Sequence, residues 1–284
     1  MATRELQTFL TRYIRDPAFA QRWIGGERDA IREEINLSEE DLALIDALDL
    51  ADLDRTGEEM RSDRLDKRRA EFSHVLKWLS LFGPADDLLN AYHAAYATGS
   101  EAQGIELKRF LDFSIRFVAS NGLPDFLAEM ARFCFEYCRV AVMDRPEDRE
   151  VVEDAEFESL PLTAMIRLAR PNRSVVFAYD CYGIALREPD PTCLPEPRPT
   201  EILFLKSKAD FKRSTIWRTR DLPIGVQGLA RDPAMLAEVV APAGASQLAP
   251  LTAYLAELHR TGVLEVVREE PQRSAPSGKK RRLA

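Results

Sequence analysis

The chain contains 284 residues, of which 45% are hydrophobic and 30% are charged. This length is sufficient for one large hydrophobic core or for two smaller ones. No run approaches the roughly 18 consecutive apolar residues that a membrane helix needs, and the polar N-terminus lacks the apolar centre of a signal peptide. We therefore expect a soluble, cytoplasmic protein that makes no contact with a membrane.

The formal net charge of −8 argues against a general nucleic-acid-binding protein. The charge is unevenly distributed along the chain. Residues 201–220 contain six bases and two acids, and residues 271–284 contain five bases and no acid. We expect the first segment to form a basic surface and the second to be a disordered tail.

Only four cysteines and three histidines are available as soft metal ligands. Cys134 and Cys138 lie four residues apart on a predicted helix and could share a metal ion, but Cys134 also lies on the apolar face of that helix. The usual motifs of nucleotide hydrolysis, dinucleotide binding, zinc proteolysis and hydrolase-fold acyl transfer do not occur in the sequence. We expect no catalytic residue, no metal and no cofactor in this chain.

Residues 1–145 are predicted to form an all-α domain. Asp16-Pro17 and Ser38-Glu39-Glu40-Asp41 are typical helix starts, because short side-chain oxygens accept hydrogen bonds from the free amides of a first helical turn. Apolar residues at intervals of three and four after Leu107 and after Leu123 predict two helices at the centre of the first core. Residues 54–71 interleave charges of both signs and predict an exposed helix.

The composition changes after Arg145-Pro146, and we place a domain boundary there. An acidic connector over residues 146–160 leads to residues 161–270, in which short β-branched and aromatic runs occur. Alternating residues and turn signals predict strands at 174–182, 202–206 and 214–219, with a proline-rich loop at 189–199.

Helices are predicted to start at Asp232-Pro233 and to cover Leu248 to Leu258, where Gly262 ends the second one. The predicted class is α+β. An N-terminal all-α domain is followed by a winged helix-turn-helix-like domain with a small three-stranded antiparallel sheet.

The third predicted strand has a polar and basic surface. Arg213, Thr215, Trp217 and Thr219 alternate with Ser214, Ile216 and Arg218 on its two faces. Such an exposed edge can accept an extended peptide as an additional strand, but basic residues also protect edge strands from unwanted pairing. The strand alone leaves both interpretations open.

The strands and the following segment PLTAYLAELHRTGVLEVV resemble the peptide-binding winged-helix domain of ribosomal-peptide biosynthesis, as found in the small quinone-cofactor chaperone family. In that family a leader peptide adds a strand to the third strand and packs against the third helix. The resemblance implies a peptide-binding site at Lys212, Arg213, Ser214, Thr215, Ile216, Trp217, Arg218, Thr219, Arg220, Leu251, Tyr254 and Leu255. The proline-rich insertion departs from the compact pattern of that family.

The N-terminal segments FLTRYIRDPAFAQRWI, LSEEDLALIDAL and MRSDRLDKRRAEF resemble the helical half of partner proteins of multinuclear non-haem iron-dependent oxidative enzymes. Those enzymes act in methanobactin and thioglutamate-type peptide pathways. The resemblance implies that the iron belongs to a partner enzyme. LSEEDLALIDALD is also similar to the small helical subunit of aromatic-ring-opening dioxygenases.

Together these features predict a non-catalytic recognition subunit that binds the leader of a precursor peptide and presents its core to an iron-dependent enzyme. Two alternatives stay open. One is a winged-helix DNA-binding regulator with a helical sensor domain; the net charge of −8 weighs against it, but the basic tail and the basic strand region keep it open. The other is the small subunit of a ring-cleaving dioxygenase.

Overall fold

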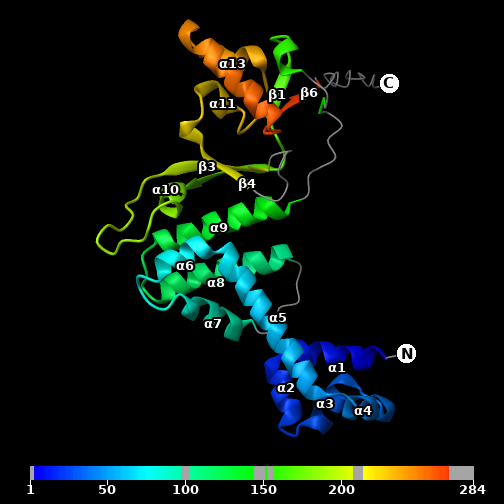
Figure 1. Ribbon diagram of the computed structural model, residues 1–284. Helices are drawn as coiled ribbons and strands as arrows, with labels where there is room; N and C mark the ends of the chain where they lie inside the picture. Colours follow the sequence, from blue (N-terminus) through cyan, green and yellow to red (C-terminus); the bar gives the residue numbers. More distant parts are fainter. Residues whose placement is uncertain (1–2, 97–102, 144–150, 153–155, 207–213, 269–284) are drawn as a thin grey trace, which may run out of the picture. The chain divides into compact units, whose positions relative to one another are not determined.

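The computed structural model describes residues 3–96, 103–143, 151–152, 156–206 and 214–268 (Figure 1). The chain divides into two compact units, Met1–Phe135 with Arg187–Pro195, and Glu136–Leu186 with Glu196–Ala284. The domain boundaries expected from the sequence stay predictions, since the acidic connector is described only in part and the basic tail lies outside the described residues. No helix in the described ranges is long and apolar enough to cross a membrane.

The first unit begins with a group of short helices whose starts follow the predicted capping signals. The Asp16 carboxylate accepts hydrogen bonds from the amides of Ala18 and Phe19 at 3.0 and 3.2 Å. Ser38 and Asp41 form a reciprocal capping box at the start of α4. Both predicted helix starts are confirmed. The bounds are α1 (Arg4–Arg15), α2 (Pro17–Ile24), α3 (Arg28–Ile35) and α4 (Glu39–Asp46).

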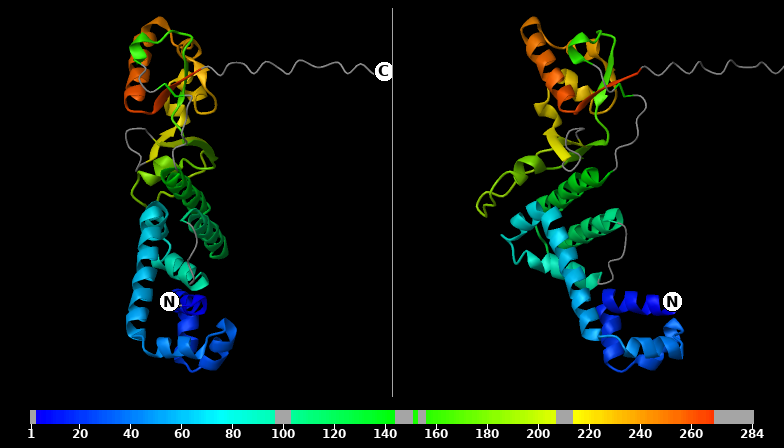
Figure 2. Two further views of the ribbon diagram at one scale, coloured as in Figure 1. Left: turned by 90° about the vertical axis from the view of Figure 1, so that its right-hand side faces the viewer. Right: turned by 45° about the vertical axis from the view of Figure 1, so that its right-hand side comes forward.

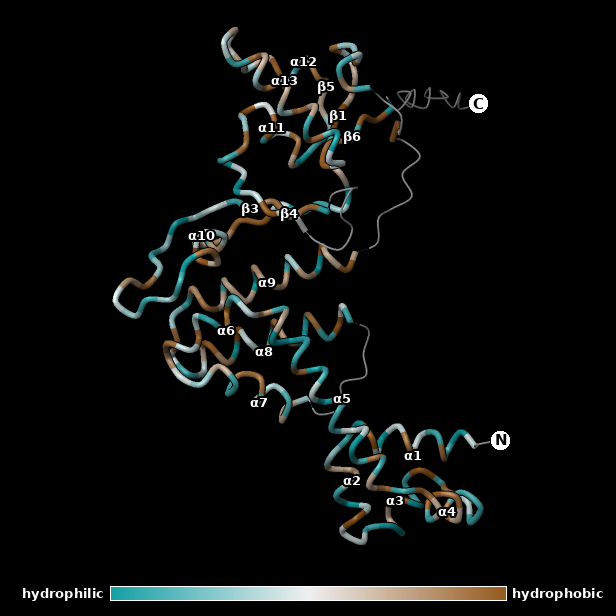
Figure 3. Tube along the Cα trace, viewed as in Figure 1, coloured by the Kyte–Doolittle hydropathy of each residue, from teal (hydrophilic) through white to brown (hydrophobic). Residues whose placement is uncertain are grey.

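Aromatic side chains form the core of these first helices. The ring of Phe9 lies 4.6 Å from that of Trp23 and 5.7 Å from that of Phe19, in edge-to-face arrangements. All three side chains are buried. In Figure 3 each of these helices carries both hydrophilic and hydrophobic residues, as expected of helices that bury one face.

The remaining helices of the first unit include the long helix α5, which both views of Figure 2 show as one continuous helix. Its charged sequence is largely exposed, as predicted, but Arg68 is only 2% exposed. The two apolar helices predicted after Leu107 and Leu123 are confirmed as α8 and α9. The bounds are α5 (Leu50–Glu71), α6 (Ser73–Leu79), α7 (Asp86–Ala95), α8 (Gln103–Ser120) and α9 (Phe126–Val142), of which α9 belongs to the second unit from Glu136 onward.

The second unit contains the strands, and the chain is an α+β protein. In the described residues the strands form two three-stranded antiparallel sheets, in the orders β2-β3-β4 and β5-β1-β6. This differs from the single small sheet that we expected. The bounds are β1 (Met165–Leu168), β2 (Asn172–Phe177), β3 (Thr200–Lys206), β4 (Ser214–Arg218), β5 (Ala234–Met235) and β6 (Leu264–Val267).

Two predicted boundaries of this unit are wrong. The strand predicted over 174–182 ends at Phe177, because Asp180 caps the short helix α10 (Cys181–Ala185). Asp232-Pro233 does not start a helix either. The chain first adds β5, and α12 (Leu236–Val240) begins after Met235.

Other elements of the chain follow the prediction. The proline-rich segment 189–199 is a loop without helix or strand. Gly262 adopts a positive φ of 68° just after α13, which suits glycine and ends the helix. The remaining helical bounds are η1 (Phe157–Ser159), η2 (Thr219–Asp221), α11 (Ile224–Gly228) and α13 (Ala245–Arg260).

A hydrophobic cluster, which we call the C-terminal cluster, joins both sheets of the second unit to α11, α12 and α13. Leu203 and Leu205 of β3 contribute to it together with Ile166 of β1. Leu255 and Val226 contribute from the helices. One face of the sheet β2-β3-β4 is therefore covered by the C-terminal cluster.

A buried ion pair crosses the second sheet. Arg167 of β1 and Glu265 of β6 lie opposite each other in the strand register, and both side chains are 4% exposed. The guanidinium donates from Nε and Nη2 to Glu265 Oε2, each at 3.1 Å. The outer edge of β6 is also paired, since the Val152 amide donates to the Val266 carbonyl at 2.9 Å.

Lys206, at the end of β3, caps α9. Its buried ammonium group donates to the carbonyls of Ala141 and Met143 at 2.7 and 3.0 Å. These carbonyls lie at and just beyond the C-terminal end of α9, where the helix provides no amide partners and where a cation is favoured.

We expect Lys206→Met to lower the free energy of unfolding by about 1.5 to 3 kcal/mol, because hydrogen bonds from a charged donor are lost while the apolar stem is kept. Urea denaturation measures this change. Lys108→Met is the matched control, since the exposed Lys108 pairs with Asp112 on the surface of α8. Its effect should stay below about 1 kcal/mol, and equal losses would contradict the capping role.

Candidate functional site

The predicted peptide-binding strand lies at the edge of a sheet. β4 pairs only with β3, in the antiparallel register that places Trp217 opposite Leu203 and Ile216 opposite Phe204. Among the described residues no strand pairs with its other edge. A free edge offers amides and carbonyls to an extended peptide.

The structure places the basic and polar residues of the predicted site in three different settings. Lys212 and Arg213 lie outside the described residues, and only the backbone of Ser214 is described. Thr215, Ile216, Trp217 and Arg218 are half-buried in β4. The strand ends one residue earlier than predicted, so that Thr219 is buried in the turn η2 and Arg220 is exposed there.

The predicted apolar residues of α13 belong to the core. Trp217 and Tyr254 pack against the C-terminal cluster, of which Leu251 and Leu255 are members. Leu255 is fully buried and Leu251 is 8% exposed. We expected these leucines to form a peptide groove, but an apolar stripe on a helix serves a core equally well. Only Tyr254 keeps a partly exposed side chain.

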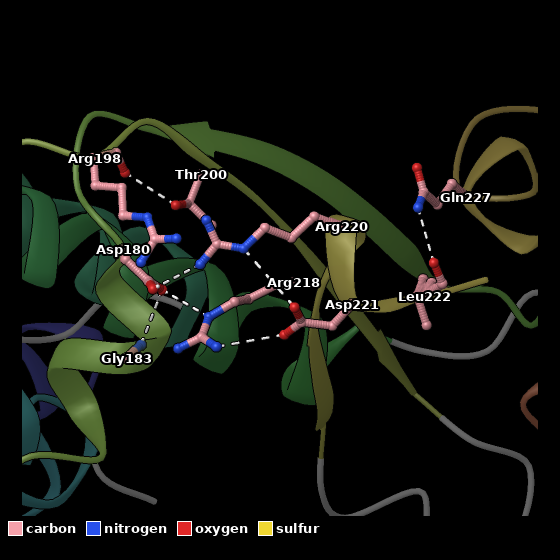
Figure 4. Close-up of polar contacts among 9 residues, drawn as sticks. All are labelled: Asp180, Gly183, Arg198, Thr200, Arg218, Arg220, Asp221, Leu222 and Gln227. Atoms are coloured by element: carbon pink, nitrogen blue, oxygen red, sulfur yellow. Dashed lines mark hydrogen bonds and ion pairs between the residues drawn. The ribbon is translucent and has the colours of Figure 1, made fainter. Parts of the chain in front are cut away.

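The opposite face of β4 carries a cluster of charges around Asp180, which Figure 4 shows together with Gly183, Arg218, Arg220 and Asp221. Arg218 Nε lies 2.9 Å from Asp180 Oδ1, and Arg220 Nη2 lies 3.0 Å from Asp180 Oδ2. Asp221 approaches the two guanidinium groups at 3.4 and 3.8 Å. We call these five residues the Asp180 cluster.

The Asp180 cluster neutralises part of the basic segment. Burial raises the pKa of the Asp180 carboxyl, but the hydrogen bond from the Gly183 amide and the ion pairs with Arg218 and Arg220 outweigh burial and lower this pKa. Asp180 is therefore ionised at neutral pH. The guanidinium groups of Arg218 and Arg220 face the carboxylates of Asp180 and Asp221. The positive charge of these two arginines, which we expected to attract a peptide, is therefore already paired.

Sequence reasoning missed Asp180, because the alternation of residues 174–182 suggested an uninterrupted strand. The signal that could have revealed it is an aspartate three residues before a glycine, which suits a helix cap. A Cβ atom on Gly183 would lie 2.7 Å from Arg218 Nη2 and 3.0 Å from Asp180 Oδ2. Glycine at this position thus leaves room for the ion pair.

Three of the four cysteines occupy buried environments that suit packing. Cys134, Cys138 and Cys181 are buried, and Cys193 is exposed. Burial raises the pKa of the Cys134 thiol to about 12, so this thiol is protonated at neutral pH and is a poor ligand and nucleophile. The described residues contain no group of three or more histidine, cysteine or acidic side chains placed to hold a metal ion.

A scan against protein-family models found no match, and a search of curated proteins found none either.

Proposed function

We propose that this protein is a non-catalytic recognition subunit. In this proposal, a winged-helix-like part of the second unit binds the leader of a ribosomally made precursor peptide, and the helical first unit contacts an iron-dependent oxidative enzyme. The iron and its ligands would belong to that enzyme. The free edge of β4 carries the proposal, because it is a preformed template for an added peptide strand.

The charges around β4 support binding of an acidic peptide at one end of the strand. Lys212 and Arg213 directly precede β4 in the sequence, whereas Arg218 and Arg220 at the other end are held by Asp180 and Asp221. An acidic leader residue near Arg218 would have to compete with these carboxylates. We therefore expect the electrostatic attraction to come mainly from the start of β4.

The surface of α13 does not favour the DNA-binding alternative. A recognition helix needs arginine or lysine side chains for phosphates and base edges. Along α13, which is described in full, the one arginine or lysine is Arg260, and it is paired with Glu257 at 2.5 Å. The exposed residues of this helix are otherwise uncharged except for Glu257.

Proline variants of β4 test the peptide site. Successive backbone amides of a strand point to opposite edges of that strand. Of the two variants Thr215→Pro and Ile216→Pro, one therefore removes a backbone hydrogen bond to β3, and the other removes an amide that points away from the sheet. The variant that keeps the folded circular dichroism spectrum should bind leader at least tenfold more weakly, a change of about 1.4 kcal/mol. The proposal requires a short precursor peptide encoded near the gene for this protein, and the probe is its labelled leader, titrated by fluorescence anisotropy.

The matched control lies on the opposite edge of the same sheet. The control variants are Val175→Pro and Val176→Pro in β2. Whichever of them stays folded should bind the leader with the same affinity as the unchanged protein. The proposal would be contradicted if the folded β2 and β4 variants lost leader affinity equally, or if the folded β4 variant lost none. Tight binding to duplex DNA that falls steeply with salt would favour the regulator.

A further inference from the structure

The first unit contains a basic cavity that the proposed peptide site does not use. It has a volume of about 310 Å³ and lies between α1, α5 and α8. This volume is at the lower end of the range for small-molecule sites. Ile14 and Met60 supply apolar surface to its lining. We call it the α5 pocket.

Positive charge dominates the lining of the α5 pocket. Two carboxylates, Asp63 and Glu106, face a larger set of cationic side chains. The cationic side chains are Arg15, Arg61, Arg64, Lys67 and Arg68. A surplus of positive charge in one concave site raises the local concentration of anions.

Two of these cations are fixed in the wall by carboxylates. Arg64 Nε lies 2.6 Å from Glu106 Oε1, which also accepts a hydrogen bond from the Tyr92 hydroxyl at 2.6 Å. Arg68 Nη1 lies 2.8 Å from Glu71 Oε2. Arg68 is 2% exposed, yet its Nε atom has no hydrogen-bond partner in the described part of the chain. A buried donor of this kind is costly unless a ligand or water satisfies it.

The other three cations form no close ion pair in the described part of the chain, although Lys67 attracts the Glu71 carboxylate over a longer distance. Among the residues that the structure describes, no carboxylate lies within ion-pair distance of Arg15, Arg61 or Lys67. The pKa of His93 is lowered first by burial and then by the positive charges of Arg64 and Arg61. Like charges at this density repel one another, and a bound dianion would remove the repulsion.

We propose that the α5 pocket binds a small phosphate monoester with an apolar body. A phosphate monoester carries a charge of about −1.5 to −2 at neutral pH and presents three acceptor oxygens. Guanidinium groups recognise these oxygens with paired hydrogen bonds. Ile14 and Met60 would contact the apolar body. This inference is independent of the proposed peptide site, since it concerns other elements of the chain.

Calorimetric titration of the full chain at constant ionic strength tests the inference, with phenyl phosphate, inorganic phosphate and citrate as probes. We expect saturable binding of phenyl phosphate with a Kd of about 1 mM or lower, and weaker binding of the other two probes. The double variant Arg61→Gln/Lys67→Gln should bind phenyl phosphate at least tenfold more weakly. Because repulsion is relieved, its Tm without ligand should not fall.

The matched control is Arg55→Gln/Arg69→Gln, which removes two positive charges from the same helix. Arg55 pairs with Asp52, and Arg69 pairs with Asp66 and Asp86. This control should retain phenyl phosphate binding. Equal losses in both double variants, citrate binding as tight as that of phenyl phosphate, or no saturable binding by the unchanged protein would overturn the inference.

Discussion

Replacing Glu265 by leucine is expected to lower the free energy of unfolding of the second unit by about 3 kcal/mol. The substitution removes the carboxylate opposite Arg167 and leaves a guanidinium group that is 4% exposed without this counter-charge. The desolvation cost of the charge then remains while the attraction is lost. Urea denaturation, followed by circular dichroism, measures the difference.

The double variant Arg167→Met/Glu265→Leu separates the cost of losing the Glu265 carboxylate from the value of the pair. Replacement of a buried ion pair by apolar side chains of similar size is often neutral or stabilising. We therefore expect the double variant to recover most of the lost stability. Glu257→Leu provides the surface control, because its partner Arg260 is 73% exposed, and it should cost less than about 1 kcal/mol. A double variant as unstable as Glu265→Leu would contradict this account.

Gly225→Ala is expected to destabilise the same unit by a similar amount, for a steric reason. A Cβ atom on Gly225 would lie 1.7 Å from the carbonyl oxygen of Val239 in α12. The obstacle is backbone, so α11 and α12 must move apart and disturb the C-terminal cluster. We expect a loss of about 3 kcal/mol, at the upper end of the cost of overpacking.

Gly228→Ala in the same helix is the matched control. A Cβ atom there has no neighbour within 4 Å. Alanine favours a helix over glycine by about 0.5 to 1 kcal/mol, so this variant should be neutral or slightly more stable. Thermal unfolding of the two variants compares them directly. If both behave alike, the close approach of Gly225 to Val239 does not limit the packing.

Local signals in the sequence were reliable where one short segment determines the outcome. Asp16-Pro17 and Ser38 to Asp41 contain both the cap and the helix that it starts, so no distant partner is needed. The same holds for Gly262, whose positive φ follows from its position after an apolar helix. These elements could be predicted from chemistry that acts within one turn.

Long-range partners explain most of what the sequence did not reveal. The charge of Arg218 is paired with Asp180, which lies 38 residues earlier in the chain. Leu251 and Leu255 show an apolar helical pattern, but that pattern does not tell whether a core or a ligand covers it. The assignment of strands to two sheets depends on pairing across the sequence, which residue types alone do not encode.

The pairing of β1 with β6 determines the order in which the second unit can form during synthesis. Arg167 and Glu265 are separated by 98 positions, so the ribosome releases β1 long before its partner strand exists. The sheet β2-β3-β4 has no such delay, because its pairing joins neighbouring strands of one intervening segment. We expect this sheet to form first, because its strands are close in sequence and the loops between them cost less entropy to close. Until β6 is synthesised, the apolar side chains of β1 stay uncovered. Chaperones that recognise exposed apolar strands would then meet the nascent chain in that interval.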